Sequence, residues 1–144
     1  MIDTKIDELY NKMQDENILI FDAPYFKEKK SVAYNDGKDF LVGINYRAIQ
    51  NKCEEYCILA EEKAHYDVGI IPNDYNSNSY CNKLTRSRNE HRAKKLAIQR
   101  LLNKEDLTSA LKKFPDICIS DLADMFEVTP QFMNEALILY NLLT

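Results

Sequence analysis

The sequence predicts an α+β fold that begins with a small, mostly antiparallel sheet and continues with two long helices and a small helical C-terminal subdomain. Three patterns predict this class: short apolar runs of strand length before residue 46, two long segments with apolar side chains at helical spacing, and short helical segments divided by prolines. The chain has 144 residues, 45% of them hydrophobic and 29% charged, which is typical of a globular domain with a substantial core.

One helix precedes the strands of the predicted sheet. Apolar residues recur at helical spacing over 4–15, which predicts an amphipathic helix. The apolar run at 17–21 predicts a strand, and segments 31–34 and 39–45 predict a β-hairpin because the Asp-Gly pair at 36–37 favours a tight turn. We expect residues 40–44 to form an edge strand that is a candidate for pairing with an extended substrate peptide; the alternative is an ordinary strand of the sheet.

Two long helices follow the hairpin. Residues 47–66 carry a broad apolar face, and Gly69 is well placed to end this helix. Segment 70–79 is rich in asparagine and serine and contains a proline, so it is predicted to be a loop. Apolar residues at helical spacing then predict a second long helix from about residue 83 to 102.

In the remainder of the chain, prolines divide the sequence into three predicted short helices, at 105–113, 119–126 and 130–142. Ser120 and Thr129 are plausible N-caps of the second and third, because a hydroxyl can accept a hydrogen bond from a first-turn N–H. We therefore divide the chain into a main domain, 1–103, and a helical C-terminal subdomain, 104–144.

The net charge of −4 is unevenly distributed. Segment 83–103 has seven basic and one acidic side chain, a net charge of +6, and it lies between segments 1–82 and 104–144 with net charges of −6 and −4. Two interpretations are open: a solvated helix face whose charges pair with acids elsewhere, or a docking surface for an acidic partner.

We expect a cytoplasmic protein without membrane contact. No apolar run is long enough to cross a bilayer, and the N-terminal residues include acids and lack the apolar core of a secretory signal.

The segment Glu61-Glu62-Lys63-Ala64-His65 carries the strongest chemical signal. It has the form of the metal-binding motif HExxH with glutamate in place of the first histidine. On a helix, Glu61 and His65 lie one turn apart on the same face and can reach one ion. Glu62 is rotated by about 100° and can act as the general base that deprotonates water. The alternative is a solvated acidic helix face with an ordinary histidine.

A catalytic zinc site needs three protein ligands and one open position. Glu90, on the second long helix, is the candidate for the third ligand, because the preceding loop is long enough to fold that helix back against the first. His91 is the competing candidate.

In their order along the chain, these motifs resemble the short, phage- or mobile-element-type members of the ImmA/IrrE metallopeptidase family. The resemblance comprises the sheet and hairpin, the segment Cys57 to Tyr66, the pattern Glu90-x-x-Ala93-x-x-Leu96-Ala97 and the C-terminal helices. It implies a zincin-like fold and a metallo-endopeptidase with Glu61, His65 and Glu90 as metal ligands and Glu62 as the catalytic base. Family members usually have histidine at the position of Glu61.

The resemblance also implies a metal and a substrate. With two carboxylates and one imidazole, the site suits zinc, and manganese or iron are possible because the ligands are harder than in a His₂Glu site. The implied partner is a protein substrate, a helix-turn-helix transcriptional repressor of a phage or mobile element, cleaved in the cytoplasm.

Two other classes of function remain as alternatives. The chain can be a catalytically inactive zincin-fold protein that acts by protein–protein binding. Residues 119–140 also resemble a helix-turn-helix, which suggests a DNA-binding regulator. The charges oppose direct nucleic-acid binding, because the second helix of that unit has no Lys or Arg and phosphate contacts require positive charge.

Overall fold

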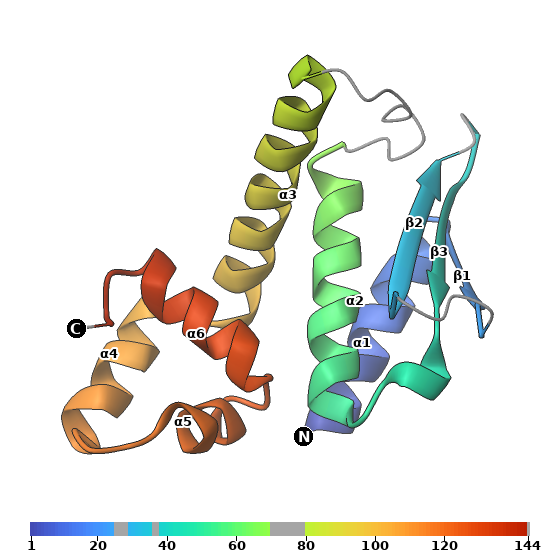
Figure 1. Ribbon diagram of the computed structural model, residues 1–144. Helices are drawn as coiled ribbons and strands as arrows, with labels where there is room; N and C mark the ends of the chain where they lie inside the picture. Colours follow the sequence, from blue (N-terminus) through green and yellow to red (C-terminus); the bar gives the residue numbers. More distant parts are fainter. Residues whose placement is uncertain (25–28, 36–37, 70–79, 144) are drawn as a thin grey trace.

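The computed structural model describes residues 1–24, 29–35, 38–69 and 80–143, and these form an α+β fold as predicted (Figure 1). The strands are β1 (Ile18–Asp22), β2 (Ser31–Asn35) and β3 (Phe40–Ile44). The helices are α1 (Ile2–Asp15), α2 (Lys52–Asp67), α3 (Tyr80–Leu101), α4 (Lys104–Lys113), α5 (Ile119–Met125) and α6 (Pro130–Leu139), with one 3₁₀ turn at Tyr46–Ala48.

The sheet is mixed, which corrects the prediction of a mostly antiparallel sheet. Its strand order is β1-β3-β2; β2 and β3 form the predicted antiparallel pair, but β1 runs parallel to β3. The second hairpin strand, β3, is therefore central, and the interpretation of it as an edge strand is wrong. The physical reason is the apolar sequence of β3, in which Val42 and Ile44 are fully buried. In the central position, a neighbouring strand covers each edge of β3. The predicted turn at 36–37 lies outside the described residues.

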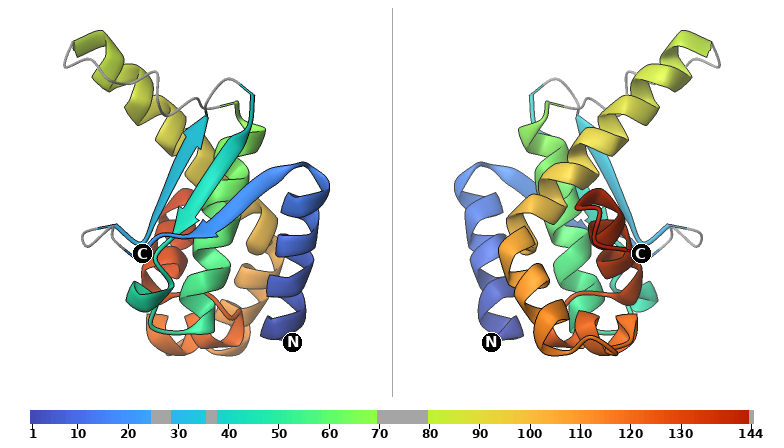
Figure 2. Two further views of the ribbon diagram at one scale, coloured as in Figure 1. Left: turned by 90° about the vertical axis from the view of Figure 1, so that its right-hand side faces the viewer. Right: turned by 90° about the vertical axis from the view of Figure 1, so that its left-hand side faces the viewer.

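Helix α2 occupies the centre of the molecule. It stands between the sheet and α3, and α1 packs against it (Figure 1). The apolar core continues from the sheet through α2 and α3 into the C-terminal helices, with Ile44, Leu59, Ile98, Leu107, Leu122 and Phe132 all buried. The first turns of α3 extend beyond this body (Figure 2). Within the described ranges, no helix combines the length and the apolar character needed to cross a membrane.

The ends of the helices test the predicted terminators and caps. Gly69 ends α2 with φ = +79°, a conformation that glycine adopts without strain, and Thr129 Oγ1 caps α6 by accepting a hydrogen bond from the Phe132 N–H at 3.1 Å. Both predictions are confirmed. The Ser120 prediction is wrong, because α5 begins at Ile119 and Cys118 is its N-cap residue. The predicted loop at 70–79 lies outside the described residues.

Replacing Asn103 with alanine is expected to lower the free energy of unfolding by about 1 kcal/mol. Its Oδ1 accepts hydrogen bonds from the backbone N–H groups of Glu105 at 2.8 Å and Asp106 at 3.2 Å, at the start of α4. Urea denaturation measures the change. Asn103→Asp keeps the acceptor and is the matched control; an equal loss in both variants would contradict the capping role.

Candidate metal site

Helix α2 sets the directions of the motif side chains. Its N-terminus is capped by the Asn51 side chain, which accepts a hydrogen bond from the Glu54 N–H at 2.9 Å. From that start, Glu61 and His65 fall one turn apart and remain partly exposed, while Glu62 points into the core and is buried. The helix therefore separates the three motif side chains into one buried and two partly exposed positions.

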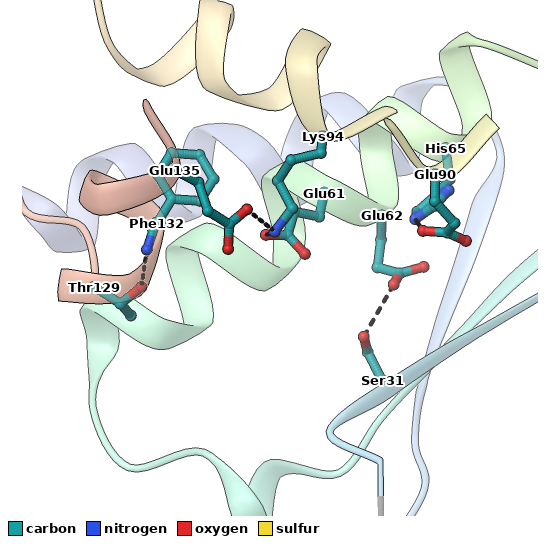
Figure 3. Close-up of polar contacts among 9 residues, drawn as sticks. All are labelled: Ser31, Glu61, Glu62, His65, Glu90, Lys94, Thr129, Phe132 and Glu135. Carbon is teal, nitrogen blue, oxygen red and sulfur yellow. Dashed lines mark hydrogen bonds and ion pairs between the residues drawn. The ribbon is translucent and has the colours of Figure 1, made fainter. Parts of the chain in front are cut away.

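Glu62 is a buried carboxyl group with one satisfied oxygen. Ser31 Oγ, at the start of β2, donates a hydrogen bond to Glu62 Oε1 at 2.9 Å (Figure 3). The other oxygen, Oε2, is buried and has no hydrogen-bond partner among the described residues. Burial raises the pKa of the Glu62 carboxyl, while the field of His65 and the Ser31 hydrogen bond act to lower it. A carboxyl oriented by one oxygen and free at the other can accept a proton from a bound molecule.

His65 meets Glu90 across the α2–α3 interface. The His65 Nε2 atom lies 3.3 Å from Glu90 Oε2; the histidine side chain is 13% exposed and the glutamate 60%. His91, the competing candidate, is instead exposed and lines a groove between α3 and α6. The structure thus places Glu90, rather than His91, beside His65.

Glu61 points away from that pair. Its Oε1 accepts a hydrogen bond from Lys94 Nζ at 2.5 Å, and Lys94 also lies 3.1 Å from Glu135 Oε2 on α6. In Figure 3 the Glu61 carboxylate faces Lys94 and Glu135, while His65 and Glu90 lie on the other side of Glu62. Across the described parts of the chain, no three His, Cys, Asp or Glu side chains form a group that could hold an ion.

The residues present therefore supply donor atoms that suit a divalent metal, but only two of the three proposed ligands lie together. An imidazole nitrogen and a carboxylate oxygen are already together, and such donors suit zinc, manganese or iron. Beside this pair, Glu62 has a buried carboxylate oxygen, Oε2, that has no hydrogen-bond partner among the described residues. The third proposed ligand, Glu61, keeps the one-turn spacing to His65 but is engaged by an ammonium group.

Lys94 is the site residue that the sequence prediction missed. Burial of Lys94 opposes its charge, but the two carboxylates of Glu61 and Glu135 outweigh this effect and raise the pKa of Lys94. A signal was present, because Lys94 lies one turn after Glu90 on α3 and Glu61 lies one turn before His65 on α2. If α3 folds back along α2 so that His65 meets Glu90, the next turn brings Lys94 to Glu61.

A polar cavity of about 530 Å³ opens next to this ion pair rather than next to His65. Its wall includes Glu61, Lys94 and Glu135, together with Ser31 at the start of β2 and Gln131 at the start of α6. The His65–Glu90 pair does not line it. Ser31 connects the two regions, because it borders the cavity and also orients Glu62.

The chain matches no family model, no curated protein and no solved structure at a significant level. The likeness to ImmA/IrrE metallopeptidases therefore depends on the motif residues themselves, and the activity that it implies is a proposal.

Proposed function

We propose that the chain is a metal-dependent endopeptidase of zincin-like fold in which Glu61, His65 and Glu90 hold one divalent ion and Glu62 is the general base. The contact that carries the proposal is the one between His65 Nε2 and Glu90 Oε2, formed across two helices beside the buried Glu62. Short motifs occur by chance, and the contact of a carboxylate from α3 with the motif histidine supports the proposal beyond the motif itself.

Each residue has a defined task in the proposed reaction. A bound divalent metal supplies a Lewis acid that polarises the scissile carbonyl and lowers the pKa of water. Glu62 accepts the proton of the attacking water at Oε2, because Ser31 already holds Oε1. Glu62 can then transfer this proton to the leaving amine.

The proposed substrate is a protein. The family resemblance suggests a helix-turn-helix repressor of a phage or mobile element, cleaved in the cytoplasm. The cavity beside Glu61 is open and polar and has room for side chains of an extended chain that approaches Glu62 along Ser31.

A catalytically inactive binding protein is the second candidate, and the Glu61–Lys94 pair favours it. Under this proposal the ion pair replaces the metal, and the exposed side of α3 makes the contacts. Within the described residues, Arg88, Arg92 and Lys95 are exposed and form no ion pair. Of these, Lys95 lines an apolar groove of about 210 Å³ whose wall also includes the exposed Ile138. Such a groove fits an acidic protein segment with one apolar anchor.

DNA binding through α5 and α6 has less support. The two helices pack against each other as in a helix-turn-helix, but α6 contains no basic residue and its Glu135 is paired with Lys94. Gln131 and Asn134 alone are insufficient to hold a phosphate backbone.

Protein purified without chelator or nickel resin is expected to contain about one zinc, manganese or iron ion per chain, measured by inductively coupled plasma mass spectrometry. The variants His65→Ala and Glu90→Ala should lose it, because each removes one donor of the contacting pair. His91→Ala, next to Glu90 but facing the groove, is the matched control and should retain it. If the protein holds no metal even after reconstitution with zinc, manganese and iron, the result would favour the binding-protein function instead.

A further inference from the structure

We propose that Lys94 is a built-in counter-ion that occupies the third ligand, Glu61, until a divalent metal displaces the ammonium group onto Glu135. This inference rests on the proposed metal site and adds a residue that sets the affinity of that site. It identifies Lys94 and Glu135 as positioning residues, which act on the metal through Glu61 rather than by touching it.

The geometry gives the ammonium group two anchoring points on different helices. Lys94 Nζ lies 2.5 Å from Glu61 Oε1 on α2 and 3.1 Å from Glu135 Oε2 on α6. All three side chains are about a third exposed, with exposed fractions of 32%, 30% and 29%. The centroid of the Phe132 ring on α6 lies 5.8 Å from Lys94 Nζ, within the range of a cation–π contact. Release from Glu61 therefore leaves Lys94 with a partner already in reach.

Charge balance explains why the chain needs such a cation. Glu61, Glu62, Glu90 and Glu135 bring four carboxyl groups into one region, and within the described chain Lys94 is the basic residue paired with two of them. The partial burial of Glu61 makes an uncompensated charge costly. A divalent ion bound by Glu61 takes over the compensation and repels the ammonium group. The exchange breaks one ion pair, strengthens another and transfers no proton.

The consequence is a pair of opposite effects on metal affinity. Lys94→Met removes the competitor while keeping most of the side-chain volume, so metal should bind about 10- to 100-fold more tightly. Glu135→Gln removes the alternative partner, holds Lys94 on Glu61 and should weaken binding. Because Glu135 acts through Lys94, Glu135→Gln should change affinity little in the Lys94→Met background. Lys95→Met removes an exposed cation that forms no ion pair with the described residues, and it controls for the general loss of one positive charge.

The test is a competition titration of the full chain with Zn²⁺ and Mn²⁺ against a chromophoric chelator, at one pH and ionic strength. Thermal melting of each variant checks that it is folded. Tighter binding by Lys94→Met, together with no effect of Glu135→Gln in that background, supports the inference.

Two results overturn the inference, and they have different meanings. If the wild-type chain and Lys94→Met bind metal with equal affinity, Lys94 is no competitor, and the proposed metal site stands. If neither binds metal at millimolar concentration, the proposed metallopeptidase fails and the inference fails with it.

Discussion

Replacing Glu62 with glutamine is expected to slow peptide cleavage by about 10²- to 10⁴-fold while the metal content of the protein stays unchanged. Glutamine has nearly the shape of glutamate, and its carbonyl oxygen can still accept the hydrogen bond from Ser31 Oγ. It cannot accept a proton from water, so the chemical step loses its base. Because Glu62 is not among the proposed ligands, the ion should remain bound.

The measurement combines cleavage of a quenched fluorescent peptide library by metal-loaded protein with the metal content of the same samples. Glu55→Gln is the matched control, because Glu55 lies on α2 but bonds to the Tyr10 hydroxyl, away from the site. It should cleave at the wild-type rate. A Glu62→Gln variant as active as wild type would contradict the base assignment. Slow cleavage with loss of metal would instead make Glu62 a ligand.

Removing both carboxylates around Lys63, with the double substitution Glu16→Gln and Asp67→Asn, is expected to lower the free energy of unfolding by about 3–5 kcal/mol. The Lys63 side chain is 4% exposed, and its Nζ lies 2.6 Å from Glu16 Oε2 and 2.5 Å from Asp67 Oδ2. The Glu16 contact connects the end of α1 with α2, while the Asp67 contact lies within α2. Without the carboxylates, α2 would bury an ammonium group that has no opposite charge beside it, and the amide oxygens would offset its desolvation only in part.

Lys63→Met should cost much less than the double substitution, which breaks the same two ion pairs of Lys63 and also the Asp67–Arg100 pair. Glu16 is 37% exposed and can turn to water, while Asp67 keeps Arg100, whose Nη1 lies 2.6 Å from Asp67 Oδ2. Methionine fills the space of the lysine stem without a buried charge. Urea denaturation of the three proteins measures the order of stability. A Lys63→Met variant as unstable as the double variant would show that the contacts, rather than the buried charge, dominate.

The parts of the fold that depend on neighbouring residues could be predicted from the sequence. Apolar periodicity located each helix, although α2 begins at Lys52 rather than at the predicted residue 47. The end of α2 near Gly69 and the cap of α6 at Thr129 followed from backbone freedom and a local hydroxyl. The parallel pairing of β1 with β3 could not be predicted, because all three strands are short and apolar and their sequences do not specify which strands pair. The same limit produced the wrong position of β3 at the sheet edge.

The candidate site divides in the same way. The motif alone placed Glu61 and His65 on one helical face and Glu62 on another, because the pitch of the α-helix sets these directions. The choice between Glu90 and His91 depended on the rotation of α3 against α2, which packing of both helices in the core decides. The partner of Glu61 likewise depended on α3 and α6 together, since Lys94 and Glu135 come from segments distant in the chain. Local sequence thus supplied the chemistry of each side chain, and long-range packing selected which charges meet.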